Sequence, residues 1–393
     1  MKIAIFTNNY LPNPFGVSMS IESFRKEFKK LGHSVYIFAP DFKGYVDEDK
    51  SACLGSSRVF RYPALDLKFK NVRFPIAFPY SYRVDRILEK LEIDVIHSQH
   101  PNLLGWQARR WAKKKNVPLV FTWHTLYDQY AHFAPFIPSK LAAWWTIKNA
   151  VGFANNADQI VTPTPSVTKI IKKWGVYNSN ISSVITGVDE NDFANSNRED
   201  YRREYEIEDD EIVVGLVSRL TAEKNVIFLA KAVLSVLKKN KKIIFALAGD
   251  GSELDAIKKI FNNEKIDSRQ FRYFGVVRGQ TKIDVYSMID IFVCASKSET
   301  QGMIISEAMY VGLPIVAVGA TGVSDLITNQ VNGLLVKENE EEFANAIERL
   351  ASDRNLRIKF SENAKRIAKE NYTASVCTQK MLKIYEKAIS RKK

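Results

Sequence analysis

The feature that most constrains the fold is an alternation of short apolar runs with segments of helical spacing, which starts near the N-terminus and starts again after residue 211. Apolar runs of about four to eight residues are typical of strands buried on both faces of a parallel sheet. Between two such runs, Ile21, Phe24 and Phe28 recur at helical spacing. The alternation predicts an α/β fold of doubly wound parallel sheets with helices on both faces. The predicted strands are residues 2–6, 34–38, 94–97, 118–122, 159–162, 212–217, 243–248, 291–294 and 314–318.

The length of the chain predicts two domains. A chain of 393 residues is too long for one ordinary core. The stretch 188–211 is rich in Asn, Asp, Glu and Arg, and we interpret it as a linker. We expect an N-terminal domain over 1–190, a C-terminal domain over 205–374, and a basic helix over 375–393 that packs back on the first domain. Open parallel sheets bind ligands at the carboxyl ends of their strands, so the loops after the strands are the candidate sites.

The loop after the strand 291–294 carries Glu299 and, eight positions later, Glu307, with Gly302 between them at the start of a helical pattern. Exposed amides at a helix start favour a diphosphate. Glu299 is placed to accept hydrogen bonds from sugar hydroxyls, and Glu307, over one turn into the helix, can bind both hydroxyls of a ribose. The alternative is an ordinary helix start with one surface glutamate.

Two further strand-end loops carry compatible groups. Arg219 and Lys224 follow the strand 212–217, where two cations can neutralise a diphosphate without a metal. Gly249 follows the strand 243–248 and allows close backbone approach. The alternative for the first loop is a solvated basic turn. The sequence contains neither a G-x-G-x-x-G motif nor a P-loop lysine, which disfavours dinucleotide oxidoreductases and NTPases.

Together, the motifs Ser-Arg-Leu-x-x-Glu-Lys-Asn from residue 218, Ala-Gly-Asp-Gly from 248 and Glu-x7-Glu from 299 resemble the family 4 retaining glycosyltransferases of the GT-B type. This resemblance extends over the whole chain. It implies two Rossmann-like domains facing a cleft, a nucleotide-sugar donor held by the C-terminal domain, transfer with retention, and neither a metal nor another cofactor. The residues that it implies as catalytic are His124, Arg219, Lys224 and Glu299. Those that it implies in donor binding are Gly16, Arg219, Lys224, Gly249, Val277, Gly302, Met303, Ile304 and Glu307.

Within that resemblance, the residues divide by role. Arg219 and Lys224 would bind the diphosphate, and Glu307 would bind the ribose. Val277 would border the base, together with Val276. Gly16 would let the backbone approach the phosphates from the other domain. His124 would face the reacting end of the sugar, although a strand-end histidine satisfied by local backbone is the plainer alternative.

The chain departs from the commoner form of the family. Where that form has Glu-Gly-Phe-Gly, this chain has Glu-Thr-Gln-Gly from Glu299, followed by Met303. The loop 8–18 carries one glycine, Gly16, where many members have two. The Glu-Thr-Gln-Gly loop and the Thr-Trp-His-Thr-Leu-Tyr stretch around His124 most resemble bacterial diacylglycerol glucosyltransferases (monoglucosyldiacylglycerol synthases). That resemblance implies transfer of glucose from a UDP-sugar to the 3-hydroxyl of 1,2-diacylglycerol.

Charge and aromatic residues point to the acceptor side. The net charge is +13, and residues 51–150 hold 15 Lys and Arg against 6 Asp and Glu. Segments 68–80 and 105–116 mix cations with aromatics, and Trp144 and Trp145 form a third spot. We interpret these features as contact with an anionic membrane surface, although such runs are often solvated faces and Trp is often core. The three scattered cysteines show no disulfide or zinc pattern, so we expect a cytoplasmic protein. The resemblance to diacylglycerol glucosyltransferases implies an enzyme that is peripheral on the inner face of the cell membrane.

Three other functions stay open at this point. One is a soluble or cell-wall-directed member of the family that acts on a sugar, a sugar phosphate or a polymer. A second is a nucleic-acid-binding protein that uses the basic half, although no binding module supports it, and we expect no nucleic-acid partner. A third is a non-catalytic module that senses a nucleotide sugar.

Overall fold

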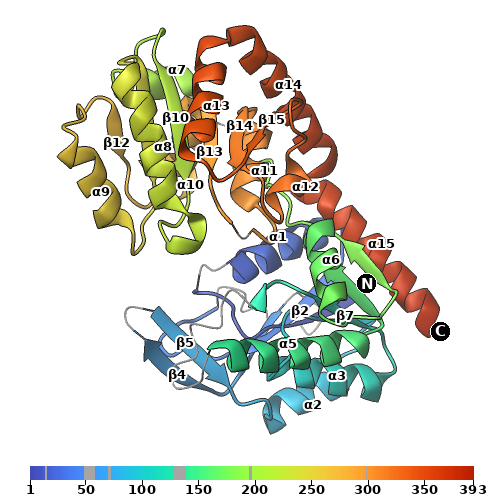
Figure 1. The fold of residues 1–393 in the computed structure, drawn as a ribbon. Helices are drawn as coiled ribbons and strands as arrows, with labels where there is room; N and C mark the ends of the chain where they lie inside the picture. Colours follow the sequence, from blue (N-terminus) through green and yellow to red (C-terminus); the bar gives the residue numbers. More distant parts are fainter. Residues whose placement is uncertain (14–15, 48–57, 70–71, 128–138, 194–196, 298) are drawn as a thin grey trace. The chain divides into compact units, whose positions relative to one another are not determined.

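The computed structural model describes residues 1–13, 16–47, 58–69, 72–127, 139–193, 197–297 and 299–393. It divides into two compact units. The N-terminal unit is Met1–Thr186 with Ala374–Lys393, and the C-terminal unit is Gly187–Thr373. Each unit contains one parallel sheet with helices on its faces (Figure 1). The predicted class of two doubly wound, Rossmann-like sheets is therefore confirmed.

The sheet of the N-terminal unit has the strand order β3-β2-β1-β6-β7-β8-β9, and every neighbouring pair is parallel. The chain runs outward from β1 to β3, returns to β6 beside β1, and then runs outward to β9. The strand order therefore reverses between β1 and β6. The strands are β1 Lys2–Phe6, β2 Ser34–Pro40, β3 Arg58–Tyr62, β6 Val95–Ser98, β7 Leu119–Thr122, β8 Gln159–Thr162 and β9 Ile181–Ser183.

Helices and a separate ribbon complete this unit. The helices are α1 Gly16–Lys30, α2 Tyr82–Lys90, α3 Leu104–Lys115, α5 Ser139–Asn155, α6 Pro165–Lys173 and α15 Ala374–Lys392. The ribbon is the antiparallel pair β4 Ala64–Phe69 and β5 Val72–Ala77. The last helix, α15, packs on α1, and its Tyr385 hydroxyl lies 2.7 Å from Nδ1 of the buried His97.

The sheet of the C-terminal unit has the order β12-β11-β10-β13-β14-β15, again all parallel. Here the order reverses between β10 and β13. Helix α8 packs against α9 and α13, and α10 packs against α11. The elements are α7 Arg198–Glu204, β10 Ile212–Val217, α8 Val226–Lys239, β11 Ile243–Ala248, α9 Leu254–Asn263, β12 Phe271–Tyr273, α10 Gly279–Met288, β13 Ile291–Cys294, α11 Met303–Val311, β14 Ile315–Val318, α12 Val323–Leu326, β15 Gly333–Val336, α13 Glu340–Ser352 and α14 Arg354–Asn371.

The nine predicted strands all exist, and their ends differ from the prediction by at most two residues. The structure adds β3, β9, β12, β15 and the ribbon, which lie at sheet edges or outside the sheets. The stretch 188–211, predicted as a linker, instead contains α7. This helix belongs to the C-terminal unit because its buried Arg202 pairs with Asp290 at 3.1 Å.

Candidate active site

The strongest candidate site lies where the strand order of the C-terminal unit reverses. Lys224 ends a short 3-10 turn (Ala222–Lys224) after β10, and Glu299 lies in the loop after the neighbouring strand β13. Their side chains form an ion pair and are only 15% and 10% exposed. Such reversal points are where open α/β sheets bind their ligands. The structure therefore brings together two of the candidate residues at the expected edge of the sheet.

An ammonium group has three N–H donors, and a carboxylate has about four acceptor positions. One contact between Lys224 and Glu299 leaves both groups with capacity for a ligand. Removing either partner of a buried ion pair is destabilising, because the other charge is then buried without compensation. The pair thus places a cation and a hydrogen-bond acceptor in contact with each other.

Arg219 lies in the same loop but in a different environment. Its guanidinium is 60% exposed and pairs with Glu223 at 3.2 Å, one helical turn along the chain. An exposed pair of this kind contributes little to stability. The guanidinium can therefore turn toward an anionic ligand with little loss.

Glycine holds the loops after β10 and β11 against each other. A Cβ on Gly249 would lie 1.7 Å from the carbonyl oxygen of Ser218, and one on Gly251 would lie 2.2 Å from that of Leu220. Gly249 also has φ +132°, a conformation that other residues rarely adopt. The amide of Leu220 donates to the carbonyl of Asp250 at 2.9 Å. These contacts fix the backbone on both sides of Arg219.

The loop after β12 adjoins this pair of loops. The amide of Gly249 donates to the carbonyl of Gly275 at 2.7 Å. Two residues on, Val277 is partly buried, whereas Val276 is exposed. The residues that the family resemblance assigns to the base thus follow a segment hydrogen-bonded to Gly249.

Helix α11 begins at the same edge with its first amides uncapped by a side chain. Gly302 is the N-cap in the left-handed conformation, with φ +66°. Met303 and Ile304 open the first turn, where helix amides have no acceptor one turn back, whereas the next amide, of Ile305, donates to the carbonyl of Gly302 at 2.8 Å. A Cβ on Gly302 would lie 2.7 Å from the side chain of Leu326. The turn is therefore suited to bind phosphate oxygens.

Glu307 is held by two side chains that the sequence analysis missed. Lys282 Nζ lies 2.7 Å from Oε1, and the Tyr286 hydroxyl donates to Oε2 at 3.0 Å. Burial and the charge of Glu307 raise the pKa of Tyr286 well above its ordinary value, so the hydroxyl stays a donor. Both partners come from α10. Their separation from Glu307, 25 and 21 positions, gives no local signal.

His124 follows β7 in the N-terminal unit. Its Nε2 lies 2.6 Å from Oε1 of Gln99, which follows the neighbouring strand β6. The Gln99 amide can pair with either neutral tautomer of His124, because it offers both a donor and an acceptor. Burial, with the nearby His100 and His97, lowers the pKa of His124 to about 3. His124 is therefore neutral near pH 7 and oriented by a side chain.

Gly16 is the first residue of α1, and a Cβ there would meet no atom of the described residues within 4 Å. The fold itself therefore tolerates a side chain at this position. The neighbouring Pro14 and Phe15, in the loop 8–18, lie outside the described residues.

Three histidines whose pKa values are lowered in the folded chain should make the N-terminal unit sensitive to acid. Burial lowers the pKa of His97 to about 3, of His100 to about 4 and of His124 to about 3. The unfolded chain titrates near about 6.5, so it binds protons that the folded unit does not bind between about pH 4 and 6.5. The free energy of unfolding should therefore fall as the pH falls through that window.

The check is to unfold the protein with urea at a series of pH values and to monitor unfolding by Trp fluorescence. His97→Gln should reduce the slope of the unfolding free energy against pH by about 1.4 kcal/mol per pH unit near pH 5, the value for one proton. His33→Gln is the comparison: His33 is partly buried and its pKa is lowered as well, without reaching the large shift of His97, so this change should reduce the slope by a smaller amount. An unchanged slope in His97→Gln would contradict the assignment.

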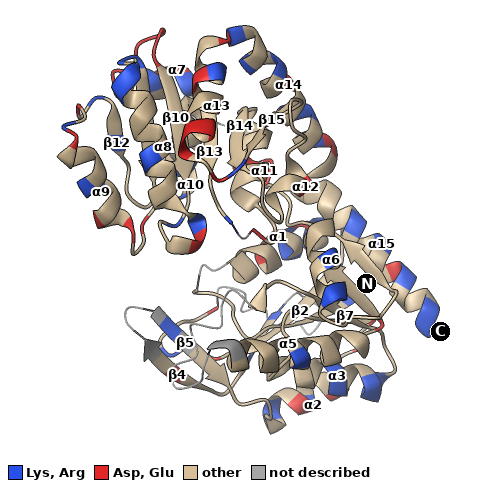
Figure 2. Cartoon of the chain, viewed as in Figure 1, with Lys and Arg blue, Asp and Glu red and all other residues tan. Residues whose placement is uncertain are grey.

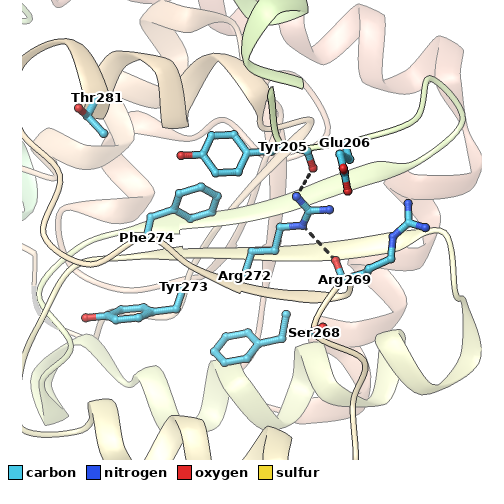
Figure 3. Close-up of a pocket in the computed structure, with 9 residues that line it drawn as sticks. Tyr205, Glu206, Ser268, Arg269, Arg272, Tyr273, Phe274 and Thr281 are labelled. Atoms are coloured by element: carbon cyan, nitrogen blue, oxygen red, sulfur yellow. Dashed lines mark hydrogen bonds between the residues drawn. The ribbon is translucent and has the colours of Figure 1, made fainter. Parts of the chain in front are cut away.

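A separate open pocket of about 600 Å³ runs along the edge strand β12 (Figure 3). Arg272 crosses it and donates to the carbonyls of Tyr205 and Arg269, while Phe274 packs on Tyr205. None of the candidate donor residues lines this pocket. Within the described ranges, no group of three acidic, His or Cys side chains is arranged to hold a metal ion.

Comparison with known proteins covers both units. Residues 15–192 match the family model Glycosyltransferase Family 4, and residues 197–367 match Glycosyl transferases group 1. The chain is 28% identical to the alpha-monoglucosyldiacylglycerol synthase of Streptococcus pneumoniae, over 88% of this chain and 77% of that protein. It is 27% identical to a GDP-mannose-dependent alpha-mannosyltransferase of Mycobacterium tuberculosis, over 90% of this chain and 89% of that protein. The structure of Anabaena HepE in complex with UDP and glucose shares the fold, with a TM-score of 0.75, 18% identity and coverage of 98% and 99%.

Proposed function

We propose that this chain, which belongs to the family 4 glycosyltransferases of the GT-B type, transfers glucose from UDP-glucose to the 3-hydroxyl of 1,2-diacylglycerol with retention at the anomeric carbon. The observation that carries the donor half of the proposal is the buried Lys224–Glu299 ion pair at the reversal point of the C-terminal sheet. A cation and a carboxylate in contact there fit a diphosphate joined to a polyhydroxyl ring.

The candidate residues bind different parts of the nucleotide sugar. Arg219 and Lys224 neutralise the diphosphate, and the first amides of α11 bind its oxygens. Glu299 accepts hydrogen bonds from the sugar hydroxyls. Glu307, oriented by Lys282 and Tyr286, accepts hydrogen bonds from the ribose. Neutral His124 serves as a hydrogen-bonding group for the sugar rather than as an acid.

The chemical step is a substitution on one face of the sugar. The acceptor oxygen forms a bond to the anomeric carbon as the bond from that carbon to the β-phosphate oxygen breaks. The leaving phosphate oxygen takes the proton of the acceptor hydroxyl, so the products are UDP and a glucosyl diacylglycerol. Catalysis then consists of positioning and of stabilising the charge that develops on the leaving group.

The lipid acceptor is supported by the relatives and by charge. The Streptococcus relative is named as a synthase of a glucosyl diacylglycerol. The N-terminal unit holds 31 Lys and Arg against 14 Asp and Glu, and a unit of that charge is attracted to anionic lipid. Among the helices in the described part of the chain, none is long and apolar enough to cross a bilayer. We propose a peripheral association with the inner face of the membrane.

The test uses a panel of nucleotide sugars offered with and without diacylglycerol in vesicles of phosphatidylglycerol and phosphatidylcholine. We expect a monoglucosyl diacylglycerol, identified by mass, from UDP-glucose only when diacylglycerol is present. Lys224→Ala is the control for donor-site chemistry. If no donor gives transfer to diacylglycerol, the lipid acceptor is wrong.

A second donor is favoured by one observation. The mycobacterial relative, at similar identity, is named as dependent on GDP-mannose. GDP-mannose therefore belongs in the donor panel, and soluble sugars and sugar phosphates belong in the acceptor panel. Transfer to a soluble acceptor without vesicles would replace the lipid assignment with that of a soluble family member.

A further inference from the structure

One helix of the N-terminal unit presents aromatic side chains to solvent. Leu141, Trp144 and Trp145 lie on α5 at positions i, i+3 and i+4, and they are 55%, 56% and 60% exposed. The helix turns Ala150 and Phe153 into the core. We call the outer three residues the α5 face. Packing against the described residues of the unit leaves both Trp residues more than half exposed.

The β4–β5 ribbon presents a second apolar face. Leu65 pairs directly with Ile76, and Leu67 and Phe78 lie two positions from these residues along their segments. Side chains two positions apart share a face of an extended segment, so all four point the same way. They are 42–55% exposed. We call this set the ribbon face.

The segment 105–116, which forms most of α3, differs from these two faces. Arg110 pairs with Asp85 and Lys114 pairs with Glu89, both at 2.9 Å, so acidic residues of α2 partly neutralise the basic side of α3. Of the two Trp residues of that helix, Trp111 is fully buried and Trp106 is 48% exposed, so α3 exposes one large apolar side chain. Of the three segments selected from sequence, α3 therefore offers the weakest apolar surface. Segment 68–80 includes residues 70 and 71, which lie outside the described residues.

Charge limits what can cover these faces. The N-terminal unit has a surplus of 17 basic residues, whereas the C-terminal unit holds 26 Lys and Arg against 30 Asp and Glu. Figure 2 shows Lys and Arg on helices α2, α3 and α15 of the N-terminal unit. On α5 itself, Lys148 Nζ lies 4.9 Å from the ring centre of Trp144. Trp beside Lys is typical of the lipid–water boundary, where the ring is half immersed and the cation meets phosphate.

We propose that the α5 face and the ribbon face together are the surface by which the N-terminal unit enters the headgroup layer of an anionic bilayer. This inference rests on the proposed lipid acceptor and deepens it, because it names the residues that contact the membrane. A second copy of the chain is the poorer occupant, since two such units would bring like charges together. The apolar side chains insert into the headgroup layer, and the surplus of basic residues attracts the unit to the anionic lipids.

The experiment is flotation of the full chain with vesicles of equal parts phosphatidylglycerol and phosphatidylcholine, without any nucleotide sugar. Trp144→Ser with Trp145→Ser, and separately Leu65→Ser with Ile76→Ser, should each weaken partitioning by about tenfold or more, because inserted apolar area is lost. Tyr177→Ser is the matched control, since Tyr177 is an exposed aromatic of the same unit outside both faces. It should partition like the unaltered chain. Trp emission should shift to shorter wavelength on vesicle addition, and this shift should shrink in the Trp144, Trp145 variant.

The outcomes separate this surface from the proposed function. Unchanged partitioning in both double variants would overturn the surface, even if glucosyl transfer to diacylglycerol is observed. Lost partitioning in both, with UDP binding retained by calorimetry, would support the surface, even if diacylglycerol is not the acceptor. If instead the Trp variant dissolves a dimer seen by light scattering without lipid and leaves partitioning unchanged, the α5 face is a subunit interface and the proposal is wrong.

Discussion

Lys224→Ala and Arg219→Ala should each lower kcat/KM for glucosyl transfer by about 30- to 1000-fold, or roughly 2–4 kcal/mol. Each change removes a charge that would stabilise the leaving diphosphate. Lys224→Ala should have the larger effect, because it also leaves the buried carboxylate of Glu299 without its cation. Arg219 pairs only at the surface, with Glu223, so its loss reports on the ligand more directly.

The measurement is initial rate against donor concentration with the acceptor saturating. Lys297→Ala is the matched control, since Lys297 lies in the β13–α11 loop and forms an exposed pair with Glu338. That variant should retain transfer within about twofold, as expected for an exposed pair. Near-normal transfer in both Lys224→Ala and Arg219→Ala would show that the diphosphate binds elsewhere.

The predictable part of the fold is the part with an unbroken apolar signal. Central strands such as β10, β11 and β13 are buried on both faces, so each is a run of apolar residues with sharp limits. Edge strands carry no such signal, because one side of them meets solvent or a loop. β12 is only three residues long and partly exposed. Helix α7 also lacks an apolar signal in the sequence, because it attaches to the unit through the ion pair of Arg202 and Asp290.

For the candidate site, sequence spacing predicted the loops but not the partners. Glu299 and Lys224 could each be placed at a strand end, because each follows an apolar run. Their pairing, across 75 positions, depends on β10 and β13 being neighbours, which is a property of the strand order. Lys282 and Tyr286 reach Glu307 from α10 for the same reason. The contact between Gln99 and His124 likewise depends on β6 and β7 being neighbours, which the sequence does not indicate.

Gly249→Ala should damage the proposed donor site more than any other single methyl group added to the C-terminal unit. The new Cβ would lie 1.7 Å from the carbonyl oxygen of Ser218, and φ is +132°. The clashing atom of Ser218 belongs to the backbone and not to a flexible side chain, so the loops after β10 and β11 must move apart. We expect a loss of about 3 kcal/mol or more in the free energy of unfolding of this unit. UDP affinity should fall as well, because Arg219 lies between the displaced segments.

Gly319→Ala provides the comparison for that change. Gly319 belongs to the same unit, its φ lies outside the left-handed region, and a Cβ there would make only ordinary contacts, the nearest at 3.8 Å. Its unfolding free energy and UDP affinity, measured by denaturant titration and calorimetry, should stay close to those of the unaltered chain. If Gly249→Ala behaves the same way, the loops after β10 and β11 yield without loss and do not fix the position of Arg219. The preorganisation assigned to the glycine contacts would then be wrong, although the charges of Arg219 and Lys224 could still bind the donor.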